Sequence, residues 1–564
     1  MIRDELRRIL EEAVARAQGS GDLPEVAVPD ATVERPTSGP HGDYASPLPL
    51  KMARAARMSP MAIAEAIRAK LEFPPSVAAV EIAAPGFLNF FVSADWLADQ
   101  VGAVLAAGHD FARVDVGGGK SVQVEFVSAN PTGPLHVGNG RGAALGDSLA
   151  RVLDKAGYRV QREYYVNDSG SQMEMFNASV YARYAQQLGL AEELPEGGYP
   201  GDYVREIAAT IAESHGRRFL EMPADDARVA LGRLGVELLL SQIRDDLALM
   251  GVHYDEWFRE QSLYDNGKID QALRLLREGG HVVEREGAVW FASASLGDER
   301  DNVLVRSNGL PTYFASDVAY HHDKFIDRRF DTVIDVLGAD HQGHVPRMKA
   351  VVGALGVESS RLVMLIYQLV NLVREGRPVV MGKRSGEFVT LREVLSEVGP
   401  DAARFFLVGR SPDAMMEFDL DLAKAQSDVN PVYYVQYAHA RMAGILRRVE
   451  GTDFRSGDAK LLTDPAEHAL IRKMLELPEI VEDAAEALAP HPLPHYAQEL
   501  ATVFHTFYDR CRVISDDVHL TRARLKLVAA CQVALATTLE LIGVSAPEEM
   551  RRDSEAPGAL PDRE

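Results

Sequence analysis

The stretch EFVSANPTGPLHVGNGRGAALGD, residues 125–147, most constrains what this chain can fold into. A short buried strand is expected over Ser121–Val127, followed by a turn rich in Asn, Pro and Gly. A helix is then expected from near His136 until Gly157 ends it, and a second strand over Gln161–Asn167. A strand, a helix and another strand form a parallel βαβ unit, which predicts a doubly wound α/β sheet.

The segments before and after this unit have different sequence patterns, which predict separate domains. Residues 1–112 are predicted to form a small α+β domain, and residues 113–400 the doubly wound region, with a largely helical insertion around 173–290. Residues 401–550 have an almost wholly helical pattern, and residues 551–564 have the composition of a disordered tail. Strand patterns return at Ala288–Phe291, Val303–Val305, Thr332–Val336 and Leu362–Leu369.

Charge and cysteine content exclude several classes of protein. The chain has 60 Lys and Arg residues against 83 Asp and Glu, a net charge of −23, which argues against indiscriminate nucleic-acid binding. No apolar stretch approaches the roughly 18 residues that span a bilayer. Cys511 and Cys531 have no neighbouring His or Cys, so we expect buried, reduced thiols, no zinc site and a cytoplasmic protein.

His136 and Asn139 are candidates for phosphate binding. The start of a helix offers N–H groups and the positive end of a dipole, and residues three apart share one face of its first turn. Both side chains can donate a hydrogen bond to a phosphate oxygen. Gly138 between them would let a flat ligand approach the backbone. The alternative is that His136 and Asn139 only cap the helix.

The segment ANPTGPLHVGN resembles the first signature of the class I aminoacyl-tRNA synthetases, with Asn139 in place of the second histidine of its common form. Val380–Gly386, VMGKRSG, resembles their second signature, with Lys383 in the position of the second lysine. Residues 164–170, 338–344 and 430–441 resemble the arginyl-tRNA synthetases, and the likeness extends to about Met550. A synthetase for another amino acid and a non-catalytic tRNA-binding paralogue are the alternatives.

The resemblance implies that the protein activates arginine with ATP, releases pyrophosphate, and transfers arginine from arginyl-adenylate to the 3′-terminal ribose of tRNA(Arg). It implies a Rossmann-like catalytic core, activation that requires bound tRNA, Mg²⁺ carried by ATP, no protein-bound metal, and a monomer. The implied catalytic residues are His136, Asn139 and Lys383, and the implied ATP contacts are His136, Gly138, Asn139, Met381 and Lys383.

An arginine substrate needs carboxylates at defined positions, because its guanidinium presents five donors in a fixed fork. By the resemblance Asp317 takes the guanidinium and Tyr313, one helical turn earlier, assists. The full set of implied arginine contacts is Glu125, Ser128, Asn130, Tyr313, Asp317 and His341. For Glu125, a role in supporting the contacting residues is the alternative. At the last position the resemblance leaves Asp340 or His341 open.

The resemblance also implies tRNA contacts at both ends of the chain. Phe87 and Asn89 match positions that contact the tRNA elbow at the D-loop, and residues 401–550 match the anticodon-binding helices. Single-stranded loops stack on aromatic side chains beside cations. The candidates with that composition are Tyr433, Tyr434, Tyr437 and Arg441. For each of these residues, packing inside its own domain is the alternative.

Overall fold

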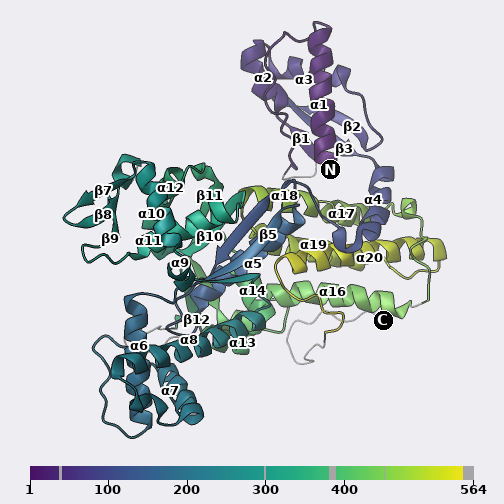
Figure 1. Cartoon of the computed structure of the whole chain (residues 1–564). Coiled ribbons are helices and arrows are strands. Elements are labelled where there is room, and N and C mark those ends of the chain that lie inside the picture. Colours follow the sequence, from purple (N-terminus) through teal and green to yellow (C-terminus); the bar gives the residue numbers. More distant parts are fainter. Residues whose placement is uncertain (37–40, 297–299, 380–388, 450, 551–564) are drawn as a thin grey trace.

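A five-stranded sheet forms the centre of the molecule (Figure 1). The computed structural model describes residues 1–36, 41–296, 300–379, 389–449 and 451–550. The strands lie in the order β11-β10-β4-β5-β6, and each neighbouring pair is parallel. Their bounds are β4 Ser121–Phe126, β5 Arg159–Val166, β6 Glu256–Arg259, β10 Thr332–Gly338 and β11 Leu362–Tyr367. The strand order reverses between β4 and β10, so the predicted doubly wound α/β class is confirmed.

Helix α5 (Val137–Lys155) lies across β4, β5 and β10. Gly146 permits this close packing, because a Cβ atom there would lie 2.2 Å from the Cγ atom of Phe126 in β4. The helix ends as expected, with Gly157 in the left-handed region at φ +87°. The other helices of the central and inserted regions are α6 Ser171–Gln187, α7 Asp202–His215, α8 Ala224–Leu249, α9 Gln261–Asp265, α10 Lys268–Glu278, α11 Tyr313–His322 and α12 Val345–Ala354.

Two expectations about strands differ from the structure. The short strand β6 lies inside a region expected to be helical, and it forms one edge of the central sheet. The runs at 288–291 and 303–305 belong to a separate antiparallel sheet, made of β7 (Val282–Arg285), β8 (Ala288–Phe291) and β9 (Asn302–Val305). Glu286 and Gly287 join β7 to β8 with φ values of +51° and +74°, the geometry of a two-residue hairpin turn. Four apolar residues do not reveal which strand they will pair with.

The N-terminal elements form a small α+β unit, seen at the top of Figure 1 in purple. Its antiparallel sheet has the order β1-β3-β2, and α2 and α3 pack against it. The bounds are α1 Ile2–Gly19, β1 Tyr44–Ser46, α2 Leu48–Ala56, α3 Pro60–Lys70, β2 Val77–Ala83 and β3 Phe87–Val92. The next helix, α4 (Ala94–Ala107), packs instead against α17 and α20 of the C-terminal region.

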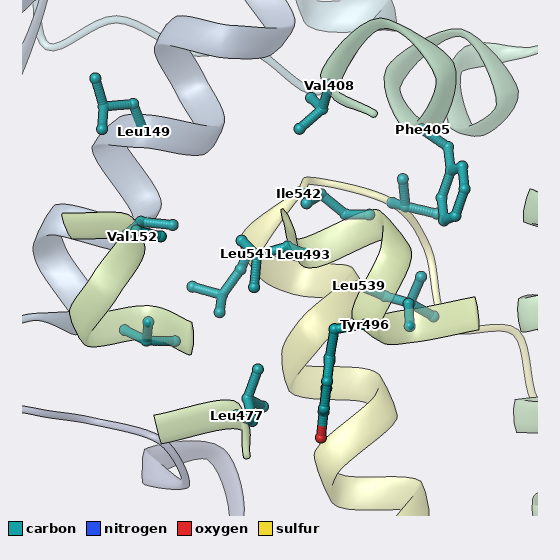
Figure 2. Close-up of a cluster of buried hydrophobic side chains, with 14 of the residues drawn as sticks. Leu149, Val152, Phe405, Val408, Leu477, Leu493, Tyr496, Leu539, Leu541 and Ile542 are labelled. Carbon is teal, nitrogen blue, oxygen red and sulfur yellow. The ribbon is translucent and has the colours of Figure 1, made fainter. Parts of the chain in front are cut away.

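The C-terminal region is a set of packed helices. Their bounds are α13 Leu391–Val398, α14 Pro400–Val408, α15 Leu420–Lys424, α16 Pro431–Arg448, α17 Pro465–Met474, α18 Leu477–Ala487, α19 Pro492–Arg510 and α20 Val518–Leu541. A third small sheet, β12 (Val370–Arg374), β13 (Arg377–Pro378) and β14 (Met416–Asp419), precedes and interrupts them. Figure 2 shows Leu149 and Val152 of α5 beside Leu477, Leu493 and Leu541, so α5 shares its core with these helices.

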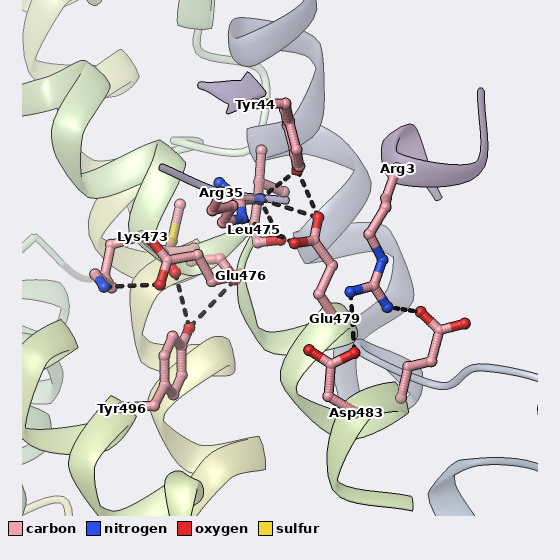
Figure 3. Close-up of polar contacts among 11 residues, drawn as sticks. Arg3, Arg35, Tyr44, Lys473, Leu475, Glu476, Glu479, Asp483 and Tyr496 are labelled. Atoms are coloured by element: carbon pink, nitrogen blue, oxygen red, sulfur yellow. Dashed lines mark hydrogen bonds and ion pairs between the residues drawn. The ribbon is translucent and has the colours of Figure 1, made fainter. Parts of the chain in front are cut away.

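Polar contacts join the N-terminal unit to α18 (Figure 3). The Glu479 carboxylate, 6% exposed, accepts hydrogen bonds from the guanidinium of Arg35 at 2.9 Å and from the hydroxyl of Tyr44 at 2.5 Å. Arg3 forms ion pairs with Glu482 and Asp483 on the next turn of the same helix. Within the part of the chain that is described, no helix is both long and apolar enough to cross a membrane.

Candidate active site

A cleft of about 680 Å³ opens at the carboxyl ends of β4 and β10, beside the start of α5. This is the switch point at which ligands bind doubly wound sheets. Its lining contains most of the residues predicted to contact ATP or arginine: Glu125, Ser128, Asn130, His136, Gly138, Asn139, Asp317 and His341. Asp340 lines it as well, so both alternatives at that position reach the cleft. Met381 and Lys383 lie outside the described residues.

His136 and Asn139 cap α5 reciprocally. The Nδ1 atom of His136 accepts hydrogen bonds from the N–H groups of Gly138 at 3.1 Å and Asn139 at 3.3 Å. The Asn139 Oδ1 atom accepts one from the backbone N–H of His136 at 3.1 Å. Capping and phosphate binding do not exclude each other here. Because Nδ1 is an acceptor, the neutral ring carries its proton on Nε2, so His136 and the Asn139 amide both present N–H donors.

The turn after β4 contains two non-glycine residues in the left-handed region. Val127 has φ +68° and Ser128 has φ +40°, and such conformations cost about 1–3 kcal/mol each. The Ser128 hydroxyl donates to Oε1 of Glu125 at 2.9 Å and accepts from the N–H of Tyr165 at 3.1 Å. These bonds hold the strained turn and bring Asn130 to the cleft, where its amide donates to Gln172 at 2.6 Å.

Two acidic side chains and one lysine form a buried cluster at the base of the cleft. Glu125 in β4 lies directly beside Asp335 in β10, and the Lys324 ammonium bridges them at 2.6 and 2.9 Å. Lys324 follows α11 in a π-helical turn (Asp323–Asp327) and is 0% exposed. Burial alone would raise the pKa of Asp335, but Lys324 and His321 hold that pKa below its usual value. Glu125 therefore already has a cationic partner within the protein.

Asp317 differs from Glu125 because it forms no ion pair with any residue that the structure describes, although the charges of His321 and Arg347 act to lower its pKa. Burial, with the nearby charges of Glu260 and Glu125, raises the pKa of Asp317 to about 7. Glu260 is 1% exposed, and neither of its carboxylate oxygens has a hydrogen bond of good geometry among the described residues. Burial also raises the pKa of Glu260. The half-buried Asp317 and the buried Glu260 form no ion pair with any of the described residues, and two such carboxyl groups suit a cationic ligand.

Sequence reasoning missed Glu260. The residue directly follows β6, a strand that the sequence pattern did not reveal. Tyr313, predicted to assist Asp317, lies one turn earlier on α11 but is absent from the cleft lining. Its side chain is exposed, and its hydroxyl lies 3.4 Å from the hydroxyl of Ser171.

The predicted tRNA contacts are divided between surface and interior. Tyr437 and Arg441 line a groove of about 560 Å³ together with Tyr508, and the Arg441 guanidinium lies 4.7 Å from the Tyr437 ring centre and 5.2 Å from that of Tyr508. Tyr433 is 8% exposed, and the Tyr434 ring packs against His505. In the N-terminal sheet, Phe87 is half-buried and Asn89 is buried.

The described ranges contain no group of three or more His, Cys, Asp or Glu side chains that could hold a metal ion. The cleft itself offers N–H donors at the start of α5 and the carboxyl group of Asp317, and Glu260 lies near Asp317 but outside the lining.

Three families of known domains match successive parts of the chain. Residues 3–92 match the arginyl-tRNA synthetase N-terminal domain, residues 100–443 the class I (R) tRNA synthetase catalytic domain, and residues 435–550 the DALR anticodon-binding domain.

Similar full-length proteins share one activity. An arginine–tRNA ligase of Dehalococcoides mccartyi is 49% identical over 543 residues, which cover 96% of this chain and 98% of the relative. One from Carboxydothermus hydrogenoformans is 48% identical, covering 92% and 94% of the two chains. The arginyl-tRNA synthetase structure from Thermus thermophilus superposes with a TM-score of 0.76 at 27% identity, over 97% of this chain and all of the other. With these matches over nearly its whole length, and a switch-point cleft that joins a helix start to the carboxyl group of Asp317, the chain belongs to the arginyl-tRNA synthetases.

Proposed function

We propose that the cleft between β4, β10 and the start of α5 is where arginine is activated, with the guanidinium at Asp317 and the ATP phosphates at α5. The overall reaction is that of an arginine–tRNA ligase: arginine and ATP form arginyl-adenylate and pyrophosphate, and arginine then passes to the 3′-terminal ribose of tRNA(Arg). The observation that carries the proposal is that one cleft combines N–H donors suited to phosphate with the Asp317 carboxyl group, whose pKa the nearby buried Glu260 helps to raise.

In this proposal the protein contributes positioning and charge stabilisation. The arginine carboxylate attacks the α-phosphate of ATP, and no covalent help from a side chain is needed. His136 and Asn139 donate to phosphate oxygens, and Gly138 leaves room for the nucleotide. Ser128 and Asn130 meet the α-amino and carboxylate ends of arginine. Mg²⁺ enters as part of the ATP substrate.

The guanidinium site of the proposal consists of Asp317 and Glu260. A guanidinium bound between them would supply the cation that the free protein lacks. Tyr313 and His341 stay assigned to the edges of this site, where Tyr313 needs a small movement to reach the ligand. Glu125 supports the turn at Ser128 while its charge is balanced by Lys324.

Substitution of the two carboxylates tests the guanidinium site. Asp317→Asn and Glu260→Gln should each raise the KM for arginine by at least about tenfold, because each removes a charge-assisted partner, and should change the KM for ATP by less than about threefold. ATP–pyrophosphate exchange, measured with and without tRNA, gives both values. Asp265→Asn, at an exposed carboxylate near Glu260, should change neither KM. Equal losses for arginine and ATP would contradict the assignment.

Lys383 and Met381 belong to the second signature, and we assign both to ATP. Lys383→Ala should slow activation by at least about 100-fold, because the ammonium stabilises charge that develops on the departing pyrophosphate. The affinity for tRNA should stay within about twofold, since the loss concerns only the transition state. Pre-steady-state adenylate formation and a filter-binding assay measure the two quantities. An unchanged rate of activation would remove Lys383 from the mechanism.

We assign tRNA binding to both ends of the chain. Residues 1–112 would contact the tRNA elbow through Phe87 and Asn89, residues 113–400 would form the catalytic domain, and residues 401–550 would bind the anticodon. The groove at Tyr437 and Arg441 supports the last assignment, because a cation between two aromatic rings suits a stacked base. The further candidates on the same helix are Tyr433 and Tyr434. We also propose that the enzyme is a cytoplasmic monomer.

A further inference from the structure

Lys324 lies behind the floor of the cleft and not in its lining. It is 0% exposed, yet the residues that it contacts all line the cleft. Its ammonium lies 2.6 Å from Oε2 of Glu125, 2.9 Å from Oδ1 of Asp335 and 4.1 Å from the ring centre of Tyr320. A buried ammonium is costly unless it is paired, so these contacts leave Lys324 little freedom to move.

Glu125 connects Lys324 to the strained turn at Val127 and Ser128. One of its carboxylate oxygens accepts from Lys324, and the other accepts from the hydroxyl of Ser128 at 2.9 Å. Ser128 and Val127 both have positive φ, a conformation that persists only where neighbouring contacts hold it. The next residues lead directly to Asn130 in the cleft.

A second cation of the same cluster, the half-buried Arg328, allows comparison. Arg328 pairs with Glu163, which lies beside Glu125 in the sheet register, and with Asp323. Glu163 also accepts a hydrogen bond from Tyr320 at 2.5 Å, and among the described residues it has no bond to the turn after β4. Lys324 and Arg328 therefore balance neighbouring carboxylates, but of these two cations it is Lys324 that is linked through a carboxylate to Ser128.

We propose that Lys324 is a positioning residue for arginine binding: through Glu125 it holds Ser128, and so it sets the position of Ser128 and Asn130 toward the substrate. The inference rests on the proposed assignment of this cleft to arginine. Lys324 touches no reacting atom. Its contribution should appear in the binding of arginine and leave the chemical step and ATP binding largely unchanged.

Lys324→Met tests this role, because methionine has a similar shape without the charge. The KM for arginine in ATP–pyrophosphate exchange should rise by at least about tenfold, while kcat and the KM for ATP change by less than about threefold. Arg328→Met, the matched loss of the neighbouring cation, should leave the KM for arginine within about threefold of the unsubstituted enzyme. An unchanged KM for arginine in Lys324→Met, or an equal rise in Arg328→Met, would overturn the proposal.

A double variant distinguishes a positioning role of Lys324 from a role in charge balance alone. Lys324→Met with Asp335→Asn removes one cation and one anion, so the net charge of the cluster is that of the unsubstituted enzyme, and the variant also serves if Lys324→Met does not fold. The proposal expects a raised KM for arginine here too, since the Lys324–Glu125 contact is absent. A normal KM would mean that Lys324 only balances charge. Asp317→Asn tests the assignment of arginine to this cleft separately from the role of Lys324. An unchanged KM for arginine in Asp317→Asn would contradict that assignment, whatever the result for Lys324→Met.

Discussion

The carboxylates of the cleft differ in whether a cation pairs with them. Glu125 and Asp335 share the Lys324 ammonium, which stabilises their charged forms. Asp317 has no such partner, and burial raises its pKa to about 7. The free enzyme thus keeps a carboxyl group that titrates near neutral pH and that a cationic substrate would ionise on binding.

The raised pKa of Asp317 predicts how arginine use depends on pH. Above pH 7 the group is charged and can pair with the guanidinium, whereas below pH 7 it is protonated and neutral. The kcat/KM for arginine should therefore fall about tenfold per pH unit below about pH 7 and level off above it, because this parameter reports the free enzyme. ATP–pyrophosphate exchange at saturating ATP and tRNA measures the profile.

Asp317→Asn is the control for this profile, since it removes the titrating group. The variant should show a low kcat/KM for arginine without the step near pH 7. A profile for the unsubstituted enzyme that stays flat down to about pH 6 would contradict the assignment of a free carboxylate at Asp317.

At the scale of the element, α5 connects the two ends of the proposed chemistry. Its first turn holds His136 and Asn139 at the cleft, its middle lies against β4 at Gly146, and its last turns contact the C-terminal helices through Leu149 and Val152 (Figure 2). The position of the helix start therefore depends on how closely the middle of α5 approaches the sheet.

Gly146→Ala tests the close approach of α5. The added methyl group would collide with Phe126, so we expect a loss of unfolding free energy of at least about 2 kcal/mol and a raised KM for ATP. Chemical denaturation and ATP–pyrophosphate exchange measure the two effects. Gly353→Ala in α12 is the matched control: nothing lies within 4 Å of its Cβ position, and alanine favours a helix by up to about 1 kcal/mol. Equal stability of both variants would contradict the packing argument.

At the scale of the whole molecule, two regions far apart in sequence form one unit. The N-terminal unit contacts α18 through Glu479 (Figure 3). Helix α4 packs against α17 and α20. The proposed elbow-binding and anticodon-binding regions are therefore joined directly to each other. A tRNA that contacts both would meet a surface whose parts are already oriented, which lowers the entropy lost on binding.

Glu479→Ala should weaken the contact between the N-terminal unit and α18. It would leave Arg35 partly buried without its carboxylate, a change that costs about 3–5 kcal/mol where such a pair is fully buried and less here, because the Arg35 side chain is 24% exposed. We expect faster amide exchange in β1–β3 and weaker tRNA binding, with the KM for arginine unchanged. Hydrogen exchange and filter binding measure these effects.

Asp95→Ala is the control for Glu479→Ala, because it removes an exposed ion pair with Lys460 that contributes at most about 1 kcal/mol to stability. It should leave exchange and tRNA binding unchanged. Normal amide exchange in Glu479→Ala would show that other contacts hold the N-terminal unit in place.

Much of the fold and part of the site could be predicted from sequence. The strand, turn and helix around His136 form as expected, and most of the predicted residues meet in one cleft. The edge strand β6 was not predicted, nor was the separate sheet that contains β8, because four-residue strands carry too little pattern. Glu260 was missed for the same reason, since it follows β6.

The order of residues by itself determined the local elements, because strand burial, helix caps and left-handed glycines depend on neighbours in the chain. It also determined which side chains gather at the switch point, because parallel strands end at one edge of the sheet. Only the tertiary structure decided which carboxylates stay without a partner. Glu125 pairs with Lys324, 199 residues away, whereas Asp317 and Glu260 form no ion pair within the described part of the chain. Pairing and desolvation depend on distances between remote segments, and those distances exist only in the folded chain.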